Sequence, residues 1–334
     1  MIAPIDKPVL ATVLLLGFPL LFVAQDKPDR PPWAQPPGMQ QTKPDPVQKD
    51  SGTDSSSPRN TVKINVNLVN VLVSVLDEHN RPAPNLPVEA FQILEEGVPQ
   101  KIDVFESETK LPVDIALMID SSMSAHKEIA FERGAAGHFI QQVLRPDDRL
   151  SVFAFDENVT QLASYSANVA TLQSAVQRIV DGAGTSIYDA VVLGSRSLEK
   201  RPSDRRRVIV MVTDAGETTS RYDFEGARKA ALHAGILLYT IVVRPVKNEN
   251  GRNTAGEHAL QTITETTGGA MFFPDSAQEL PIIFDRIDSE LRTQYRLAYY
   301  PNPRGPANTY RTIEVKVLPG YTARHRTTYL TGPS

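Results

Sequence analysis

Four near-continuous apolar runs, separated by amphipathic segments, constrain the fold of this chain more than any other feature. The runs occupy residues 113–119, 150–155, 208–212 and 236–243. Runs without polar alternation are typical of parallel strands that are covered on both faces. Apolar residues at helical spacing lie between the runs, in residues 128–144, 169–180, 187–199 and 224–234. This order of elements predicts an α/β domain with a doubly wound, mostly parallel sheet.

A short strand and a final helix complete the predicted domain. The strand is expected over residues 270–273, and apolar residues then recur on one face of a helix over 280–291. Ser276 and Glu279 match a capping box, whereas Pro281 favours a start a few residues later. The sequence therefore leaves the first residue of this helix open.

Segments rich in strand signals flank the α/β domain on both sides. On the amino side, apolar and polar residues alternate over 62–68, and strands are predicted over 69–76, 91–94 and 101–105. On the carboxyl side, strands are predicted over 295–299, 310–317 and 324–330. Because an isolated small sheet is only marginally stable, we expect the two segments to pair into one β-sandwich with the α/β domain inserted. Two separate β appendages are the alternative.

The first 60 residues differ in composition from the rest. Residues 1–24 contain an interrupted apolar stretch that is short for a membrane span, and we interpret them as a secretory signal peptide. An uncleaved N-terminal anchor is the alternative, and both place the remainder in the secreted, periplasmic or cell-envelope compartment. Residues 25–60 are rich in Pro, Gln, Ser and Asp and are predicted to be a disordered linker. The remaining predicted boundaries are 61–110 for the first β-rich segment, 111–292 for the α/β domain and 293–332 for the second β-rich segment.

Composition excludes several classes of function. The chain of 334 residues contains no cysteine, which excludes disulfides, thiolate metal sites and cysteine nucleophiles. Its formal net charge of -4 argues against nucleic acid as a partner. The six histidines do not show zinc-ligand spacing.

Oxygen-bearing side chains follow the predicted strands at the points where those strands end. Asp120, Ser122 and Ser124 form an Asp-x-Ser-x-Ser run directly after the first apolar run. Thr185 lies in a glycine-containing loop before a helix, and Asp214 follows the third apolar run. Ligands of open α/β sheets bind at the carboxyl ends of the strands, so these side chains can converge on one site. Two carboxylates, three hydroxyls and water suit the octahedral oxygen coordination of Mg²⁺.

Each part of this pattern has a simpler interpretation by itself. The run that begins at Asp120 can cap a helix, Asp214 can lie in a turn, and Thr185 can cap the following helix. The joint occurrence of all parts, in order and at matching strand ends, favours the metal site.

Other charged residues near these strands are interpreted as structural. We expect three acidic residues to be helix caps or solvated side chains: Asp189, Glu217 and Asp223. We expect the arginine run that precedes a predicted strand to be a solvated edge: Arg205, Arg206 and Arg207.

The pattern resembles the von Willebrand factor type A (VWA) domain with its metal-ion-dependent adhesion site. That family has Asp-x-Ser-x-Ser, then a distant Thr, then an Asp after a later strand, and the five residues above fill these positions in order. The resemblance covers about residues 111–291. One departure is Ala215, because the family often has Gly directly after the last Asp. The flanks resemble a subgroup of bacterial secreted VWA-containing proteins, in residues 71–75, 91–97 and 295–301.

The resemblance implies binding of a protein partner, and no enzymatic activity. In the family, the residues matching Ser122, Ser124 and Thr185 contact the metal, and those matching Asp120 and Asp214 hold it directly or through water. A partner's Asp or Glu carboxylate then completes the coordination of Mg²⁺, for which Mn²⁺ or Ca²⁺ can substitute. The alternatives are a Mg²⁺-dependent phosphohydrolase-like enzyme and a structural cell-envelope component whose metal only stabilises the fold. Contact with a membrane is expected only through the possible N-terminal anchor.

Overall fold

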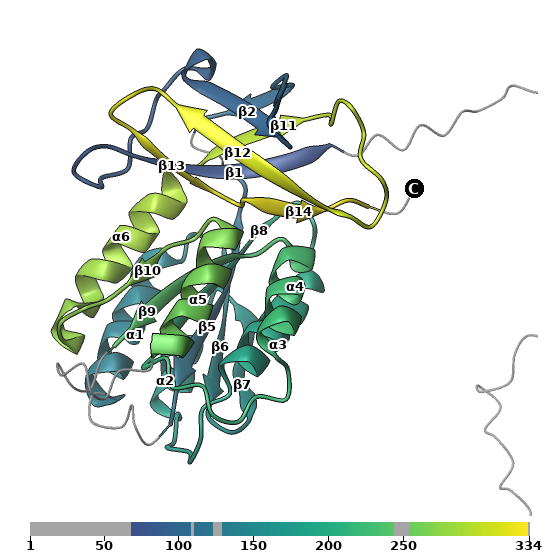
Figure 1. The fold of residues 1–334 in the computed structure, drawn as a ribbon. Helices are drawn as coiled ribbons and strands as arrows, with labels where there is room; N and C mark the ends of the chain where they lie inside the picture. The colour runs from purple at the N-terminus through teal and green to yellow at the C-terminus, as the bar shows by residue number, and fades with distance from the viewer. Residues whose placement is uncertain (1–67, 108–109, 123–128, 244–253, 333–334) are drawn as a thin grey trace, which may run out of the picture. The chain divides into compact units, whose positions relative to one another are not determined.

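The computed structural model describes residues 68–107, 110–122, 129–243 and 254–332. These residues belong to one compact unit, Val62–Ser334. They form one six-stranded sheet with helices on both faces and two four-stranded sheets (Figure 1). The predicted signal peptide, the linker and the alternating residues 62–67 lie outside the described residues.

The six-stranded sheet is parallel except at one edge. Its strands are β5 (Val113–Asp120), β6 (Arg149–Phe155), β7 (Val159–Ser166), β8 (Arg206–Thr213), β9 (Leu237–Val242) and β10 (Met271–Phe272). Their order is β10-β9-β8-β5-β6-β7, and only β7 pairs antiparallel with its neighbour. β5 lies in the interior of the sheet and is buried at every position, as its continuous apolar run predicts.

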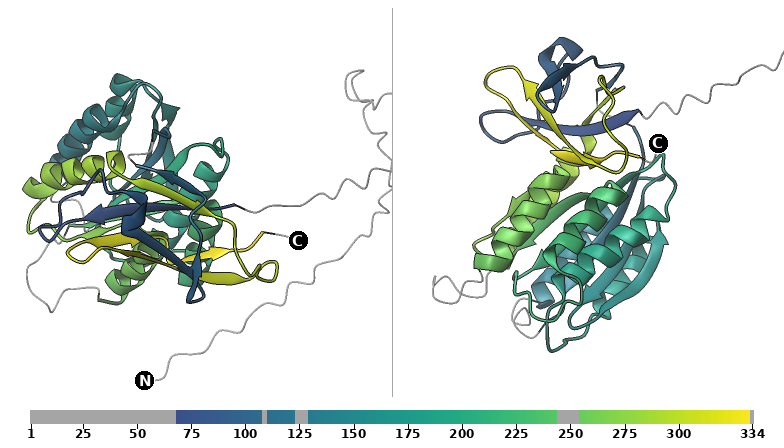
Figure 2. Two further views of the ribbon diagram at one scale, coloured as in Figure 1. Left: turned by 90° about the horizontal axis from the view of Figure 1, so that it is seen from above. Right: turned by 45° about the vertical axis from the view of Figure 1, so that its right-hand side comes forward.

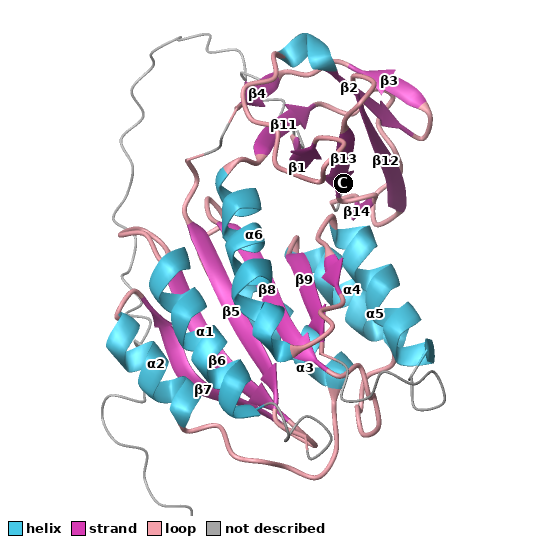
Figure 3. Cartoon of the chain, turned by 90° about the vertical axis from the view of Figure 1, so that its left-hand side faces the viewer, coloured by secondary structure: helices cyan, strands magenta, loops and turns pink. Residues whose placement is uncertain are grey.

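Within the described residues, six α-helices cover the two faces of this sheet. They are α1 (Ile129–Val143), α2 (Val169–Gln177), α3 (Ile187–Glu199), α4 (Phe224–Ala234), α5 (Thr254–Thr267) and α6 (Leu280–Arg292). Helices α1, α2 and α6 contribute to the core on one face, and α3, α4 and α5 to the core on the other (Figure 3). This arrangement confirms the predicted doubly wound α/β domain. None of these helices combines the length and the apolar composition that a bilayer span requires.

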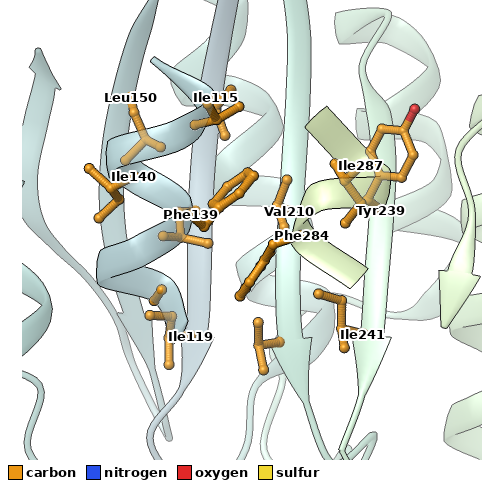
Figure 4. Packing of buried hydrophobic residues seen from close by; sticks show 14 of the residues in the cluster. Ile115, Ile119, Phe139, Ile140, Leu150, Val210, Tyr239, Ile241, Phe284 and Ile287 are labelled. Atoms are coloured by element: carbon orange, nitrogen blue, oxygen red, sulfur yellow. The ribbon is translucent and has the colours of Figure 1, made fainter. Parts of the chain in front are cut away.

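Aromatic stacking joins α1 and α6 over the sheet. The rings of Phe139 and Phe284 are stacked with their centroids 4.5 Å apart, and they lie over Ile115 and Val210 of the central strands (Figure 4). Burial of each such side chain stabilises the fold by about 1.5–3 kcal/mol. α6 therefore belongs to the core of the α/β domain, although it leads directly into the carboxyl-terminal strands.

The two flanking segments pair with each other, as predicted, and form a β-sandwich. Its strands are β1 (Val69–Leu76), β2 (Phe91–Glu95), β3 (Val98–Gln100), β4 (Val104–Glu106), β11 (Tyr295–Tyr299), β12 (Tyr310–Val317), β13 (Thr322–His325) and β14 (Thr328–Leu330). The sheets have the orders β13-β1-β11-β4 and β14-β12-β2-β3. Each contains strands from both segments, with Val71 opposite Leu297 in one sheet and Ile93 opposite Val315 in the other.

The structure corrects several predicted elements. Helix α5 and strand β7 are additional to the predicted elements. The strand expected over 324–330 is divided between β13 and β14, which belong to different sheets. Of the strand expected over 101–105, only the last two residues are in a strand, β4, and β3 lies before the expected range. Helix α6 begins at Leu280 after a 3-10 turn (Ala277–Glu279), so the later start indicated by Pro281 is the correct one.

Buried ion pairs fix the amino ends of the central strands, where solvated arginines were expected. Asp114 of β5 is fully buried and forms ion pairs with Arg201 and Arg205, both at 2.7 Å. Arg206 is only 4% exposed and donates hydrogen bonds to the backbone oxygens of Leu111 and Leu291. The expectation of a solvated edge was therefore wrong, because these guanidinium groups pair with a buried carboxylate and with carbonyl groups.

We expect Asp114→Asn to lower the free energy of unfolding by about 3 kcal/mol, because it removes one member of a buried ion-pair cluster. The matched control is Glu225→Gln, which breaks the exposed pair between Glu225 and Arg228 and is expected to cost less than about 1 kcal/mol. Urea unfolding of both variants measures the difference. Equal losses in the two variants would show that the buried cluster contributes nothing beyond a surface pair.

His325 joins two strands of the sandwich in its neutral form. Its Nε2 atom accepts a hydrogen bond from the Val315 backbone N–H at 3.0 Å, and Nδ1 lies 2.9 Å from the Arg326 carbonyl oxygen. Nδ1 must therefore carry the single proton and donate it. Burial lowers the pKa of His325 below its usual value of 6.5, since a charged ring would lose the bond from Val315.

We expect the stability of the sandwich to decrease as the pH falls below about 6.5. The unfolded chain then binds a proton at residue 325 that the folded chain excludes, with a slope of up to about 1.4 kcal/mol per pH unit. His325→Gln retains one acceptor and one donor but does not titrate, so the difference between the two proteins should vanish at low pH. Urea unfolding at pH values from about 7.5 to about 5.5, which span the usual pKa of histidine, measures this difference. If the free energies of unfolding of the two proteins changed with pH in parallel, the assignment of a neutral His325 would be contradicted.

Candidate metal centre

Asp120, the last residue of β5, is buried at the carboxyl edge of the sheet. Its Oδ1 atom accepts a hydrogen bond from the Ser122 backbone N–H at 2.9 Å, and Oδ2 accepts one from the Thr213 hydroxyl at 2.6 Å. Thr213 ends the adjacent strand β8 and directly precedes Asp214. The ends of β5 and β8 are thus joined through the carboxylate of Asp120.

The electrostatic environment of Asp120 is unfavourable for its charge. The pKa of this carboxyl is raised to about 6, chiefly by burial and to a smaller extent by the nearby charge of Asp214, against the hydrogen bonds from Thr213 and Ser122, which lower it. Among the described residues, neither Asp120 nor Asp214 forms an ion pair with a Lys, Arg or His side chain. Two carboxylates therefore lie at one sheet edge without a compensating cationic side chain among the described residues.

The loop that carries Thr185 lies directly against the Asp120 segment. Gly182 donates its backbone N–H to the Ser121 carbonyl oxygen at 2.7 Å, and Ser122 forms a β-bridge with Gly182. A Cβ atom on Gly182 would lie 2.2 Å from a carboxylate oxygen of Asp156, so only glycine permits this approach. Thr185 follows three residues later and is 2% exposed.

The loop after β8 closes the same region from the other side. The carbonyl oxygen of Thr185 accepts hydrogen bonds from the backbone N–H groups of Thr218 and Thr219, at 2.9 and 3.1 Å. Asp214 Oδ1 accepts the Gly216 backbone N–H at 2.9 Å, which forms a tight turn after the strand. Ala215 within this turn has a φ of 64° and is fully buried. The departure from glycine noted in the sequence therefore falls on a left-handed residue.

These hydrogen bonds bring four of the five predicted residues to one edge of the sheet. They are Asp120, Ser122, Thr185 and Asp214. The fifth, Ser124, lies outside the described residues. The donor set consists of oxygen atoms alone, as a hard divalent cation requires. In the described part of the chain, no group of three or more His, Cys, Asp or Glu side chains is arranged for a metal, so hydroxyl groups are needed to complete any site here.

Two of the three acidic residues interpreted as caps, Asp223 and Glu217, bind the amino ends of helices, whereas Asp189 is a buried residue of α3 that binds a loop. Asp223 accepts the Gly226 N–H at the start of α4. Glu217 accepts the backbone N–H groups of Ile187 and Tyr188 in the first turn of α3, and Asp189 accepts two backbone N–H groups from the loop that precedes α4. Each carboxylate satisfies backbone donors that have no partner within a helix or strand. These carboxylates fix the loops around the carboxyl edge of the sheet. The oxygen donors that remain for a metal are those of the four residues named above.

The role of Thr213 was missed by the sequence interpretation, which considered only the aspartate that follows it. Its hydroxyl donates to Asp120 and also accepts the Ala215 backbone N–H at 3.1 Å. The sequence signal for this role is a hydroxyl residue at the last position of a buried strand. The neighbouring strand ends in the run that begins at Asp120.

The fold and these strand-end groups define an α/β domain of the type that binds ligands at the carboxyl edge of its sheet. A family model for the von Willebrand factor type A domain matches residues 114–286, which is just over half of the chain. The chain therefore belongs to the VWA domain family. Membership in this family supports a role in protein interaction.

Known relatives share the domain at low identity. The uncharacterized protein sll0103 of Synechocystis sp. is 30% identical over 112 residues, which are 33% of this chain and 26% of that protein. The chain therefore spans about a quarter of the length of this curated relative.

Solved structures share the fold alone. BatB from Bacteroides thetaiotaomicron is 18% identical, with 53% of this chain and 98% of that chain covered and a TM-score of 0.43. A von Willebrand factor type A protein from Catenulispora acidiphila is 11% identical, with 81% and 76% covered and a TM-score of 0.48. The vWF domain of the pilus tip protein Mfa5 from Porphyromonas gingivalis is 12% identical, with 54% and 95% covered and a TM-score of 0.44.

We expect Ala215→Val to lower the free energy of unfolding by about 3 kcal/mol, because a β-branched residue is strained at positive φ and the site is closely packed. Ala170→Val, on the exposed side of α2, is the matched control and should cost less than about 1 kcal/mol. Ala215→Gly should retain the loop. Urea unfolding distinguishes the three variants, and equal effects of the two valines would contradict the left-handed assignment.

Proposed function

We propose that this chain binds a protein partner through a divalent cation held at the carboxyl edge of its central sheet. The observation that carries the proposal is the pair Asp120 and Asp214, two neighbouring carboxylates that no cationic side chain of the described residues compensates. A bound cation would compensate the negative charge of the buried Asp120 carboxylate and would interact favourably with Asp214 as well.

The residues that would hold the cation are those of the sequence pattern. They are Asp120, Ser122, Ser124, Thr185 and Asp214. Both oxygens of Asp120 already accept hydrogen bonds. These bonds orient the carboxylate, so that it would hold the cation partly through the neighbouring groups. Mg²⁺ is the ion we propose, with Mn²⁺ or Ca²⁺ as substitutes, because all donors are oxygen atoms.

A site of this composition favours an anionic group as the additional ligand of the cation. Three of the five donors are uncharged hydroxyl groups, so two carboxylates at most offset the charge of a divalent cation. An Asp or Glu side chain of a partner protein supplies a further oxygen ligand with a negative charge. Family membership favours this role over the phosphohydrolase alternative, and the same edge offers hydroxyl groups where such an enzyme needs a second acid. We place the protein in the secreted, periplasmic or cell-envelope compartment on the basis of its N-terminal sequence.

We expect Asp120→Asn to stabilise the metal-free protein at pH 8 by about 1–2 kcal/mol, because it removes a buried charge whose pKa is raised. The advantage should disappear as the pH falls below about 6, where the folded wild-type protein takes up a proton at Asp120. In saturating Mg²⁺ the order should reverse, since only the wild-type protein gains binding free energy. Urea unfolding with chelator or Mg²⁺ tests this expectation, and equal stabilisation of both proteins by Mg²⁺ would place the metal elsewhere.

We expect binding of acidic peptides to require both the cation and Thr185. An array of short peptides that contain Asp or Glu, with Asn or Gln counterparts, is probed with the protein in Mg²⁺ and in chelator. Signals should be confined to the acidic peptides in Mg²⁺ and should fall at least about tenfold in Thr185→Val, which keeps the shape and removes the hydroxyl. Thr171→Val, on the exposed side of α2, is the matched control. If the acidic peptides still bound in chelator, the proposal of a contact bridged by a metal would be contradicted.

A further inference from the structure

A cavity of about 420 Å³ lies at the opposite end of the central sheet from the candidate metal centre. It is lined by residues at the amino ends of β8 and β9 and by residues of β1 and β11. In Figure 1 and in the right-hand view of Figure 2, the β-sandwich lies at this end of the sheet. The volume lies in the range of small-molecule sites in proteins.

The lining of this cavity is strongly basic. Of the described residues that line it, five are arginines and Asp204 is the only acidic residue. Three of the arginines have partners elsewhere. Arg205 pairs with Asp114, Arg296 pairs with Glu106, and Arg206 donates to backbone carbonyl oxygens. In each of these three the Nε atom has a hydrogen-bond acceptor, which distinguishes them from the other two, Arg207 and Arg326.

Arg207 and Arg326 form no ion pair with a carboxylate of the described residues. Arg207 donates only to carbonyl oxygens, of Ala234, Glu199 and Arg201. The Nε atom of each is buried without a hydrogen-bond partner. A guanidinium group that is partly removed from water without a counter-charge is costly, so both charges favour an anion in the adjoining space.

Arg326 has the larger unused capacity of the two. It donates one hydrogen bond, from Nη2 to the Asn70 carbonyl oxygen, and its guanidinium group lies over the ring of Tyr329, 5.6 Å from the centroid. Arg326 also lines a second cavity of about 490 Å³, whose described lining contains no acidic residue. The side chain is thus held in place by an aromatic ring and one carbonyl group, between two cavities whose described linings contain a single acidic residue, Asp204.

We infer that the cavity beside Arg207 and Arg326 binds a small organic anion whose phosphate or carboxylate group is attached to an apolar body. Guanidinium groups bind both anions through paired N–H donors. The apolar body would lie against Leu72, Leu111 and Ile236, which line the same cavity. Neither the cation nor the partner carboxylate of the proposed function is involved, so the two sites fail or succeed separately.

The test measures binding of phenyl phosphate, benzoate and benzyl alcohol to the full chain by calorimetry and thermal unfolding. The two anions separate the possible head groups, and the alcohol keeps the apolar body without the charge. We expect at least one anion to raise the melting temperature by about 3 °C or more at ten times its Kd, and the alcohol to have no effect. A Kd weaker than the order of 10 mM for both anions would overturn the inference.

Variants locate the site. Arg326→Gln should weaken the Kd of the bound anion at least about tenfold, whereas Lys229→Gln, which removes a charge from the exposed face of α4, should leave it unchanged. An equal Kd in wild type and Arg326→Gln contradicts the inference. Should Arg326→Gln fold poorly, Arg326→Lys and a crystal soaked with the anion replace it, and an anion bound away from Arg207 and Arg326 contradicts the inference as well. Mg²⁺ binding should be unaffected in Arg326→Gln.

Discussion

The structure depends on a central strand that is buried along its whole length and carries a carboxylate near each end. Strand β5 is covered on both faces, so Asp114 and Asp120 are both removed from water. Such groups are tolerated only with a counter-charge or with strong hydrogen bonds. Asp114 receives two arginines, Arg201 and Arg205. Asp120 receives a hydroxyl and a backbone N–H but no cationic side chain of the described residues, and this contrast is the physical basis for proposing a metal at one end of the strand only.

The same sheet positions the β-sandwich. Helix α6 packs through Phe284 into the core and ends where β11 begins. At its carboxyl end Glu290, which is 1% exposed, pairs with Arg324 of β13 and accepts the Tyr239 hydroxyl of β9 at 3.0 Å. Thr327 donates its backbone N–H to the Thr266 carbonyl oxygen in α5 at 3.1 Å. The flanking segments are therefore fixed to the inserted domain by polar contacts, although their strands pair with each other.

Sequence patterns predicted the elements with continuous or regularly spaced apolar residues and missed two elements without such a pattern, α5 and β7. The limits of α3, α4, β11 and β12 follow directly from their apolar spacing. Helix α5 is rich in threonine, which has low helix propensity, and part of its contact with β9 is a hydroxyl pair between Thr240 and Thr264 at 2.9 Å. Strand β7 is a half-exposed edge without continuous apolar character. Such elements are determined by tertiary pairing, which local periodicity does not report.

The candidate metal centre was more accessible to sequence interpretation than the arginine-lined cavity, and the reason is topological. Parallel strands place their carboxyl ends at one edge, so Asp120 and Asp214 can be brought together from strand order alone. Arg207 lies in the α/β domain and Arg326 directly after β13 of the sandwich, and tertiary contacts, among them the pairing of β13 with β1, bring both to one cavity. An arginine run in a sequence therefore indicates neither burial nor pairing.

Strand β8 connects the two ends of the sheet. Arg207 lies at its start and Thr213, directly before Asp214, at its end, a separation of about 20 Å at the rise of a β-strand. β8 is paired on both sides, with β5 and β9, and seven of its eight residues are buried. A strand held in this way has one arrangement available to it, whereas coupling between distant sites requires an element with two. The two proposed sites, one for a cation at the aspartates and one for an anion at the arginines, are therefore expected to act independently.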